Sequence, residues 1–437
     1  MRKLFIIIVL GCLLIPSATI EKLNRERKER FGGDLAVYQK NRNENELEKI
    51  EIESLIDSFK EKKIFYKKET KEWKLVEFKW FDEKIPLSLS FFWRKESKID
   101  KIVYFLPGSG MNFRGNFFTP LDRNLALFFS ERGYLVIGIT PREDNVIYFF
   151  QKCDFMKDWG LKKHKKDIRK VISLIEEKAD LPYEILGFSA GAFYALDYAA
   201  TFYKDLLLKK IIVLDAVGEY DPVKEKDLKE KAEITENAIK NLIEKEKIYV
   251  DNSLALLKIL ILIESLFPYI SSGVERINHS GCFTLEGLLY FTAIYTNRLE
   301  GPTTKYTNLP ENWYYEQGWC NGTYIFKENP RKDIYFLKKT KVFTLKKAAL
   351  KAKSGIYPYK SLQDIFSVIG GGRNYSIPYQ TIRCEVLWIN SELGMGNHTF
   401  CLKKIKEPNF ILIKGYGHAD LIYAKEAEKE VWRHIFN

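Results

Sequence analysis

Short apolar runs alternate with amphipathic stretches along most of the chain. Two β-rich runs, at residues 75–81 and 86–94, are separated by the polar sequence Asp82-Glu83-Lys84, which predicts an antiparallel hairpin. Later runs are short and mostly apolar, as in parallel strands that are buried on both faces. These later runs span residues 102–106, 135–139, 183–186, 211–214, 385–389 and 410–413.

Apolar residues at the helical period fill segments that lie between or after these runs. The three clearest stripes are Phe118, Leu121, Leu125, Phe128 and Phe129; Ile168, Val171, Ile172 and Ile175; and Ala424, Ala427, Val431 and Ile435. Strands that alternate with helices require a parallel sheet with helical crossovers. The sequence therefore predicts an α/β fold with a mostly parallel central sheet and helices on both faces.

A long insertion interrupts this sheet, because the alternation stops near Gly218 and resumes only at residue 385. Within it, residues 227–247 predict a charged helix and residues 254–267 a very apolar one. The apolar helix is either buried inside a cap or forms a lid that meets lipid or an apolar substrate. We expect the insertion to be a large, mainly helical cap.

The N-terminal region is strongly charged and carries one apolar helical stripe, Ile52, Leu55, Ile56 and Phe59, which predicts an accessory helical arm. Five parts are expected in all. They are a signal peptide or membrane anchor at 1–18, the charged helical arm at 19–72, the first part of the core at 73–218, the cap or lid at 219–382 and the second part of the core at 383–437.

An export signal is predicted at the start of the chain. Arg2 and Lys3 precede an apolar run at residues 4–10, and small residues follow. The sequence Val9-Leu10-Gly11-Cys12 resembles a bacterial lipoprotein box, which makes Cys12 a lipidation candidate. A lipoprotein, a cleaved signal and a retained anchor all stay open, and the alternative is a buried N-terminal helix. We expect an exported protein that is membrane-anchored or extracytoplasmic.

Composition and charge narrow the classes of protein. With 46% hydrophobic residues the chain is too apolar to be disordered. Its 70 Lys and Arg against 58 Asp and Glu give a net charge of +12, and the two signs are interleaved, which favours solubility over nucleic-acid recognition. The six cysteines form no C-x-x-C pair, so no structural zinc is expected. If the chain is exported, Cys282 and Cys320 could form a disulfide within the cap.

A G-x-S-x-G pentapeptide spans Gly187 to Gly191 and carries the candidate nucleophile Ser189. It directly follows the run at 183–186 and directly precedes the helical run at 192–200. A nucleophile elbow needs this order of strand, sharp turn and helix, with glycines where neighbouring backbone comes too close for a Cβ atom. A serine hydroxyl becomes a good nucleophile only when a base takes its proton.

His418 is the candidate base, because among five histidines it alone follows a predicted late strand, at the sheet edge that presents Ser189. The other four, His164, His279, His398 and His434, are expected to be surface or packing residues.

The candidate acid is Glu392, which follows the run at 385–389 and lies between nucleophile and base in chain order. Asp215, at the end of the run at 211–214, is the alternative acid. Asp420 is expected to pair with nearby backbone.

An oxyanion hole is predicted from the glycine-rich loop at residues 107–111, which follows the run at 102–106. The backbone amides of Ser109 and Ala190 would donate to the developing negative charge. The alternatives for this loop are an ordinary glycine turn or a phosphate cradle. The Gly-Lys-Ser/Thr ending of a Walker loop is missing, and the sequence shows no dinucleotide fingerprint.

These motifs, in this order, resemble the α/β-hydrolase superfamily, and the lipase and esterase members in particular. The set comprises Pro107-Gly108-Ser109-Gly110, Gly187-Phe188-Ser189-Ala190-Gly191, a carboxylate after a late strand, and Gly417-His418-Ala419-Asp420-Leu421. The resemblance implies a Ser/His/acid triad, no cofactor, and cleavage of carboxylic esters. The sequence departs from it with Glu392 in place of the commoner Asp, and with Pro107 where many members have His.

We therefore expect an exported serine hydrolase whose partner is a hydrophobic ester substrate, with membrane contact through the N-terminus or the cap and no nucleic-acid partner. Thioester or amide cleavage and acyl transfer use the same triad and stay open. A noncatalytic surface binding protein on a hydrolase scaffold, and a structural membrane partner that uses the apolar helix, are the competing classes.

Overall fold

The computed structural model describes residues 51–146, 153–251, 254–276, 279–294 and 319–436. The signal segment at 1–18, its candidate Cys12 and most of the arm lie outside these ranges. In the described part of the chain, no helix is both long and apolar enough to cross a membrane.

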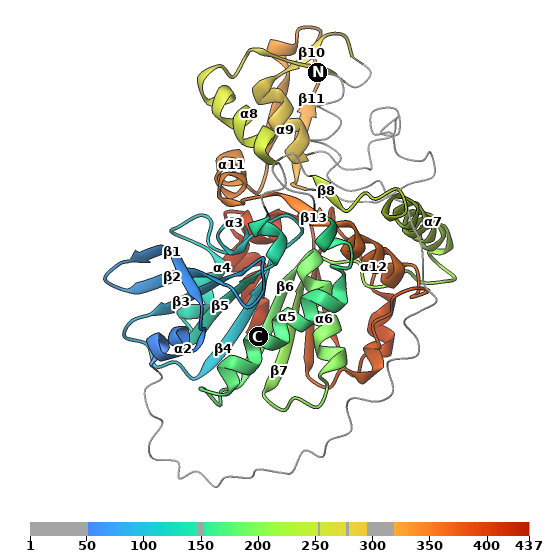
Figure 1. Ribbon diagram of the computed structural model, residues 1–437. Coiled ribbons are helices and arrows are strands. Elements are labelled where there is room, and N and C mark those ends of the chain that lie inside the picture. Colours follow the sequence, from blue (N-terminus) through green and yellow to red (C-terminus); the bar gives the residue numbers. More distant parts are fainter. Residues whose placement is uncertain (1–50, 147–152, 252–253, 277–278, 295–318, 437) are drawn as a thin grey trace.

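A central sheet of nine strands organises the described residues (Figure 1). Its order is β1-β2-β3-β5-β4-β6-β7-β14-β15. Strands β1 to β3 run antiparallel to their neighbours, and the strands from β5 to β15 are parallel. The bounds are β1 (Lys62–Glu69), β2 (Trp73–Trp80), β3 (Leu87–Arg94), β4 (Lys101–Leu106), β5 (Tyr134–Thr140), β6 (Tyr183–Phe188), β7 (Leu208–Leu214), β14 (Glu385–Ser391) and β15 (Asn409–Ile413). The predicted hairpin and mostly parallel sheet are confirmed.

Two hydrophobic cores lie on opposite faces of this sheet, because side chains along each strand alternate between faces. On β4, Tyr104 belongs to one core and its neighbours Val103 and Phe105 to the other. The first core is covered by α2 (Ile52–Ser58), α5 (Leu161–Glu176), α6 (Ala190–Thr201), α7 (Lys226–Ile243) and α12 (Tyr359–Ile369). The second is covered by α3 (Phe113–Asn116), α4 (Leu125–Ser130), α13 (Asp420–Tyr423) and α14 (Ala427–Glu430). The prediction of helices on both faces is confirmed.

Three local predictions are wrong. The stripe from Phe118 to Phe129 is not one helix, because Pro120 cannot continue a helix and α4 starts only after Asn124, whose side chain caps it. The terminal stripe is split into α13, α14 and a 3-10 turn, Trp432–Ile435. Residues 62–69 of the expected helical arm form β1, a lysine-rich strand at the sheet edge, where charged side chains suit a solvent-facing strand.

The insertion leaves the sheet after β7 and returns at the adjacent strand β14, as expected. In its described residues, short antiparallel strand pairs stand between the helices. The pairs are β8 (Tyr249–Asp251) with β13 (Ile356–Pro358), β9 (Ser271–Glu275) with β10 (Cys282–Thr284), and β11 (Gly322–Ile325) with β12 (Ile334–Leu337). Glycine, serine and tyrosine in these segments favour turns and strands over helix.

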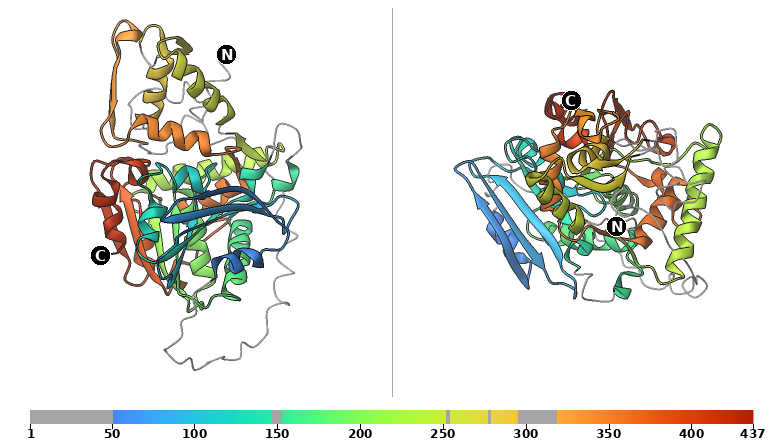
Figure 2. Two further views of the ribbon diagram at one scale, coloured as in Figure 1. Left: turned by 90° about the vertical axis from the view of Figure 1, so that its left-hand side faces the viewer. Right: turned by 90° about the horizontal axis from the view of Figure 1, so that it is seen from above.

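The insertion has two parts, which Figures 1 and 2 show from three sides. Helices α7 and α12 pack together beside the sheet. The remainder, which we name the upper module, comprises residues 254–276, 279–294 and 319–351. Its helices are α8 (Leu254–Leu266), α9 (Leu285–Ile294) and α11 (Val342–Lys351). The upper module stands above the end of the sheet at which the parallel strands finish.

Candidate active site

Ser189 lies at a strained turn between β6 and α6. Its φ of 54° and ψ of −119° place it in a backbone region that residues with side chains rarely adopt. A Cβ atom on Gly187 would lie 2.3 Å from the carbonyl oxygen of Gly191, so only glycine fits there. A Cβ atom on Gly191 would in turn lie 2.1 Å from the carbonyl oxygen of Leu106. The motif therefore forms the predicted strand, sharp turn and helix.

Asp215 and His418 form a buried pair at the same edge of the sheet. The Asp215 Oδ2 atom lies 2.6 Å from His418 Nδ1, and the two side chains are 0% and 1% exposed. The same carboxylate accepts hydrogen bonds from the backbone N–H and the hydroxyl of Ser391, at 2.6 and 2.8 Å. Since the carboxylate is the acceptor, His418 carries its proton on Nδ1, and its Nε2 atom can accept another.

Glu392 does not occupy the position predicted for it. Its Oε2 atom accepts the backbone N–H of Gly415 at 2.8 Å, across the loop that follows β15. Ser391, the last residue of β14, is the one that points to Asp215, and consecutive side chains along a strand point to opposite sides. The structure therefore brings the alternative acid Asp215 to His418 and leaves Glu392 as a loop-stabilising carboxylate.

Contacts of neighbouring residues link the turn of Ser189 to His418 and Asp215. The ring of Phe188, which directly precedes Ser189, stacks on the His418 ring with centroids 4.5 Å apart. The Ser189 backbone N–H donates to the carbonyl of Leu214, and Asp215 is the next residue. Strand register accounts for this, because Phe188 on β6 pairs with Leu214 on β7. The chain thus gathers three side chains from the ends of β6, β7 and β15.

The loop at residues 107–111 lies against the turn of Ser189. A Cβ atom on Gly108 would lie 3.3 Å from Ser189 Cβ. In the described part of the chain, the backbone N–H groups of Ser109 and Ala190 have no acceptor, as an oxyanion hole requires. Sequence reasoning missed the residue that holds this loop, Asn116, whose Oδ1 accepts the Gly108 N–H at 2.9 Å.

Asn116 is itself held on its other side. Its Nδ2 donates to the hydroxyl of Tyr423 at 3.1 Å, and that hydroxyl donates to the Gly115 carbonyl at 2.9 Å. Asn116 is 2% exposed, so it is fixed by protein groups rather than by water. Only the distant Tyr423 completes this network, and nothing in the sequence near the loop indicated the pairing.

The upper module meets the loop of His418. The rings of Trp319 and His418 are nearly perpendicular with centroids 5.3 Å apart, and the Trp319 carbonyl accepts the Ala419 N–H at 2.7 Å. Asp420 accepts the backbone N–H of Asn321 and the hydroxyl of Thr340, at 2.7 and 2.6 Å. It also accepts the N–H of Gly417 at 2.9 Å, so its predicted backbone pairing is found.

Other histidines in the described ranges make packing contacts. His164 Nε2 lies 2.9 Å from Ser361 Oγ, and burial lowers the pKa of His164 to about 3, so its ring is neutral. His398 pairs with Glu225 at 2.5 Å, and His279 stacks on Phe326.

No protein-family model matches the sequence, and no curated protein matches it either. Solved structures do match the fold. A candidate lipase from Sulfolobus solfataricus has a TM-score of 0.56 and 17% identity, over 86% of this chain and 98% of its own. The chain has the α/β-hydrolase fold. A carboxyl esterase from Bacillus coagulans in complex with glycerol gives a TM-score of 0.43 at 14% identity, covering 84% and 96% of the two chains. An α/β-hydrolase fold protein from Nakamurella multipartita gives 0.37 at 11%, covering 80% and 94%.

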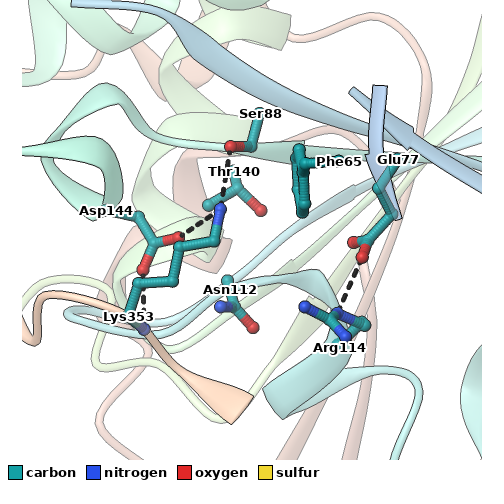
Figure 3. Close-up of a pocket in the computed structure, with 8 residues that line it drawn as sticks. All are labelled: Phe65, Glu77, Ser88, Asn112, Arg114, Thr140, Asp144 and Lys353. Carbon is teal, nitrogen blue, oxygen red and sulfur yellow. Dashed lines mark hydrogen bonds and ion pairs between the residues drawn. The ribbon is translucent and has the colours of Figure 1, made fainter. Parts of the chain in front are cut away.

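In this α/β-hydrolase fold, a polar pocket lies next to the loop at residues 107–111, since Asn112 is among its lining residues and Ser189 is not (Figure 3). Its carboxylates face cations. Glu77 lies 2.7 Å from Arg114 Nε, and Asp144 lies 3.6 Å from Lys353 Nζ, which also donates to Ser88 at 3.3 Å. The pocket is therefore a buried ion network that joins β2 and β3 to the insertion.

Two other groups could suggest a metal or a disulfide. Asp82, Glu83 and Asp167 are the one cluster in the described ranges with metal-ligand spacing, but Arg142 already lies 2.8 Å from Asp82 and 2.9 Å from Asp167. This cluster is an ion-pair network. Cys282 and Cys320 are free thiols, so the disulfide considered for the cap is not formed.

Proposed function

We propose that the protein is a serine hydrolase that cleaves carboxylic esters through an acyl-enzyme intermediate, with Ser189 as nucleophile, His418 as base and Asp215 as acid. The observation that carries the proposal is the buried 2.6 Å contact between Asp215 and His418 beside the strained turn of Ser189. A buried carboxylate that fixes the tautomer of an imidazole next to a serine at a sharp turn is the arrangement that acyl transfer requires.

The reaction begins when the Ser189 Oγ atom attacks the ester carbonyl carbon while His418 Nε2 takes the hydroxyl proton. The carbonyl oxygen becomes an oxyanion, to which the Ser109 and Ala190 N–H groups donate. The tetrahedral intermediate then expels the alcohol, which leaves with the proton from His418. A water molecule, deprotonated by His418 in its turn, attacks the acyl-enzyme, releases the carboxylic acid and restores the Ser189 hydroxyl.

Asp215 acts on the imidazole rather than on the ester. Its carboxylate accepts a hydrogen bond from the Nδ1–H group, holds the ring in one orientation and stabilises the positive charge that the ring acquires in both steps. Its own position is fixed by Ser391 and by Asn390, whose side chain bonds the backbone N–H and carbonyl of Ala216 at 3.1 and 3.0 Å.

A hydrophobic acyl group is the substrate class that we favour. The structure with the TM-score of 0.56 belongs to a candidate lipase. Trp319 of the upper module lies beside His418 and is 47% exposed, which puts a large apolar ring next to the candidate site. Pockets for apolar ligands are lined mainly by such side chains.

Hydrolysis of nitrophenyl esters of short and long acyl chains tests this function, with Ser189→Ala as the matched variant. We expect turnover by the wild-type protein, preference for longer chains, and loss of at least about a thousandfold in kcat in the variant. A fluorophosphonate probe should label the wild-type protein at Ser189 and leave the variant unlabelled. Absence of labelling and of turnover by the folded wild-type protein would instead favour a noncatalytic binding protein.

We further propose that the protein is exported and held at a membrane by its N-terminus. The support is the sequence alone: Arg2 and Lys3 before the apolar run, and the lipoprotein-like sequence that ends at Cys12. Cys12→Ser should release the protein from the membrane fraction if Cys12 is lipidated. Unchanged fractionation would exclude the lipoprotein branch, and a cytosolic wild-type protein would exclude export itself.

A further inference from the structure

Helix α8 of the upper module turns its aliphatic side chains to the solvent. Ile259, Leu262, Ile263 and Leu266 follow the helical spacing of one face and are 52%, 59%, 39% and 72% exposed. The segment directly after the helix continues this surface with Phe267, Tyr269 and Ile270, which are also exposed. The stripe of four aliphatic residues is named the α8 face below. A contiguous apolar surface of this kind marks an interaction site rather than an ordinary water-facing helix.

The charged residues of α8 point the opposite way. Glu264 is 5% exposed and lies 2.6 Å from Lys346 on α11. Lys258 donates to the backbone carbonyl of Ala352 at 2.6 Å. The usual orientation of a surface helix is therefore reversed in α8: its charged side chains bond to the rest of the protein, and its apolar side chains face outward. This arrangement is favourable only if an apolar medium covers the α8 face.

The α8 face offers an incoming partner few polar groups. Ser265, which lies beside it, donates its hydroxyl to the Leu262 carbonyl of its own helix. Backbone N–H and C=O groups inside a helix are bonded to one another. Protein interfaces gain their orientation from polar groups and from aromatic and Arg anchors at their centres, whereas lipid chains require only aliphatic surface. The chemistry of the α8 face suits lipid.

Electrostatics favours an anionic lipid. The upper module contains eleven Lys and Arg against five Asp and Glu in its described residues, which gives +6, half of the net charge of the whole chain. Lys341, which directly precedes α11, and Lys347 on α11 are exposed, and α11 contacts α8. Two of the acidic residues are bonded internally, since Glu286 accepts from Tyr335 and Asp333 pairs with the buried Arg276.

We propose that the α8 face docks on an anionic lipid surface, with its aliphatic stripe in the boundary between headgroups and acyl chains and with the net positive charge of the upper module attracting the headgroups. Insertion of amphipathic helices into this boundary is driven by buried apolar area and by attraction to anionic lipids. The α8 face lies on the module that also contacts the His418 loop, so docking brings the candidate active site to the lipid surface. The proposal rests on the surface of α8 and does not require Ser189 to be catalytic.

A fluorophore that responds to polarity tests the contact directly. The full-length Leu262→Cys variant is labelled with nitrobenzoxadiazole and mixed with vesicles of phosphatidylcholine and phosphatidylglycerol. The matched control is Leu206→Cys, because Leu206 is 83% exposed and precedes β7, at the opposite end of the sheet from the upper module. We expect a blue shift and a severalfold gain in emission at position 262, none at position 206, and a weaker response with phosphatidylcholine alone or at high salt. Labelled wild-type protein gives the signal of the native cysteines.

A second comparison measures affinity. Leu262→Ser combined with Leu266→Ser should lower binding to the same vesicles by about tenfold or more, since each leucine would bury apolar surface in the lipid and serine would not. The matched control combines Leu206→Ser with Val223→Ser, two residues outside the upper module that are even more exposed, and should bind as the wild-type protein does. Any membrane contact made by the N-terminus is common to these proteins and cancels in the comparison.

Two results would overturn the proposal. One is an unchanged spectrum at position 262 with vesicles that bind the protein. The other is a blue shift without vesicles that grows with protein concentration, together with a larger species in sedimentation, because a second copy would then cover the α8 face. Loss of ester hydrolysis in Ser189→Ala with unchanged vesicle binding separates this proposal from the catalytic one.

Discussion

Asp215→Asn is the substitution that most sharply tests the site, because the sequence favoured Glu392 and the geometry favours Asp215. The Oδ1 atom of Asp215 accepts the Ser391 backbone N–H, so an asparagine keeps its carbonyl oxygen there and places its NH₂ group at the position of Oδ2. That group lies 2.6 Å from His418 Nδ1 and donates to it. The imidazole proton then moves to Nε2, and the ring can no longer accept the proton of Ser189.

The expected loss follows from this change of tautomer. In serine proteases the equivalent change lowers kcat by about 10⁴-fold, which corresponds to about 5 kcal/mol of transition-state stabilisation. We expect a loss of this order for Asp215→Asn, with KM changed little. Glu392→Gln removes only the charge that accepts the Gly415 N–H, and it should change kcat less than about threefold.

The assay is steady-state hydrolysis of a nitrophenyl ester by both variants, with circular dichroism and thermal unfolding to show that each one folds. Fluorophosphonate labelling of Ser189 should slow in Asp215→Asn and stay normal in Glu392→Gln. The opposite pattern, with Glu392→Gln severely impaired and Asp215→Asn within tenfold of the wild-type protein, would refute the assignment of the acid.

Two further predictions concern buried polar groups near the site. Asn116→Ala removes the acceptor of the Gly108 N–H, so the loop that carries the Ser109 amide loosens. We expect kcat to fall by about tenfold or more with little change in KM. Tyr423→Phe removes only the second hydrogen bond of Asn116 and should lower kcat less. An equal rise in KM would contradict a role in the transition state. Burial raises the pKa of Glu143 to about 8. The folded protein therefore keeps a proton on Glu143 that the unfolded chain releases near pH 4.5. The free energy of unfolding falls for this reason as pH rises from about 4.5 to 8, and above pH 8 this group no longer makes it depend on pH. Glu143→Gln should therefore be more stable than the wild-type protein at pH 8 and show a smaller advantage at pH 5, by urea unfolding; a difference independent of pH would refute this.

The core strands could be read from the sequence because parallel strands buried on both faces are continuous apolar runs. Strand β1 was not predicted, because its four lysines interrupt the apolar run; lysines suit a strand at the solvent-facing edge of a sheet. They are Lys62, Lys63, Lys67 and Lys68. The stripe around Pro120 repeats at the helical period even though the ring of proline ends a helix there.

The candidate nucleophile and base could be located because Ser189 directly follows β6 and His418 lies in the loop after β15, two strands that finish at the same edge of the sheet. The acid could not be chosen from chain order. Side chains alternate along a strand, so either Ser391 or its neighbour Glu392 could face Asp215, and the sequence does not show which one does. The φ of 49° at Asp215 is likewise not visible in the sequence. The outward direction of α8 was hidden for a similar reason, since a helix that is apolar all round is expected to be buried.

The bonds between residues 319–321 and the loop of His418 restrict how an ester reaches Ser189. The Trp319 carbonyl accepts the Ala419 backbone N–H, and the Asn321 backbone N–H donates to the Asp420 carboxylate. The upper module therefore cannot swing away as a hinged cover without pulling on the residues that follow His418. A rearrangement of the module that lipid or substrate causes acts on the loop of His418 through these bonds and through Thr340, which donates to Asp420, so the position of the module and that of the imidazole are linked.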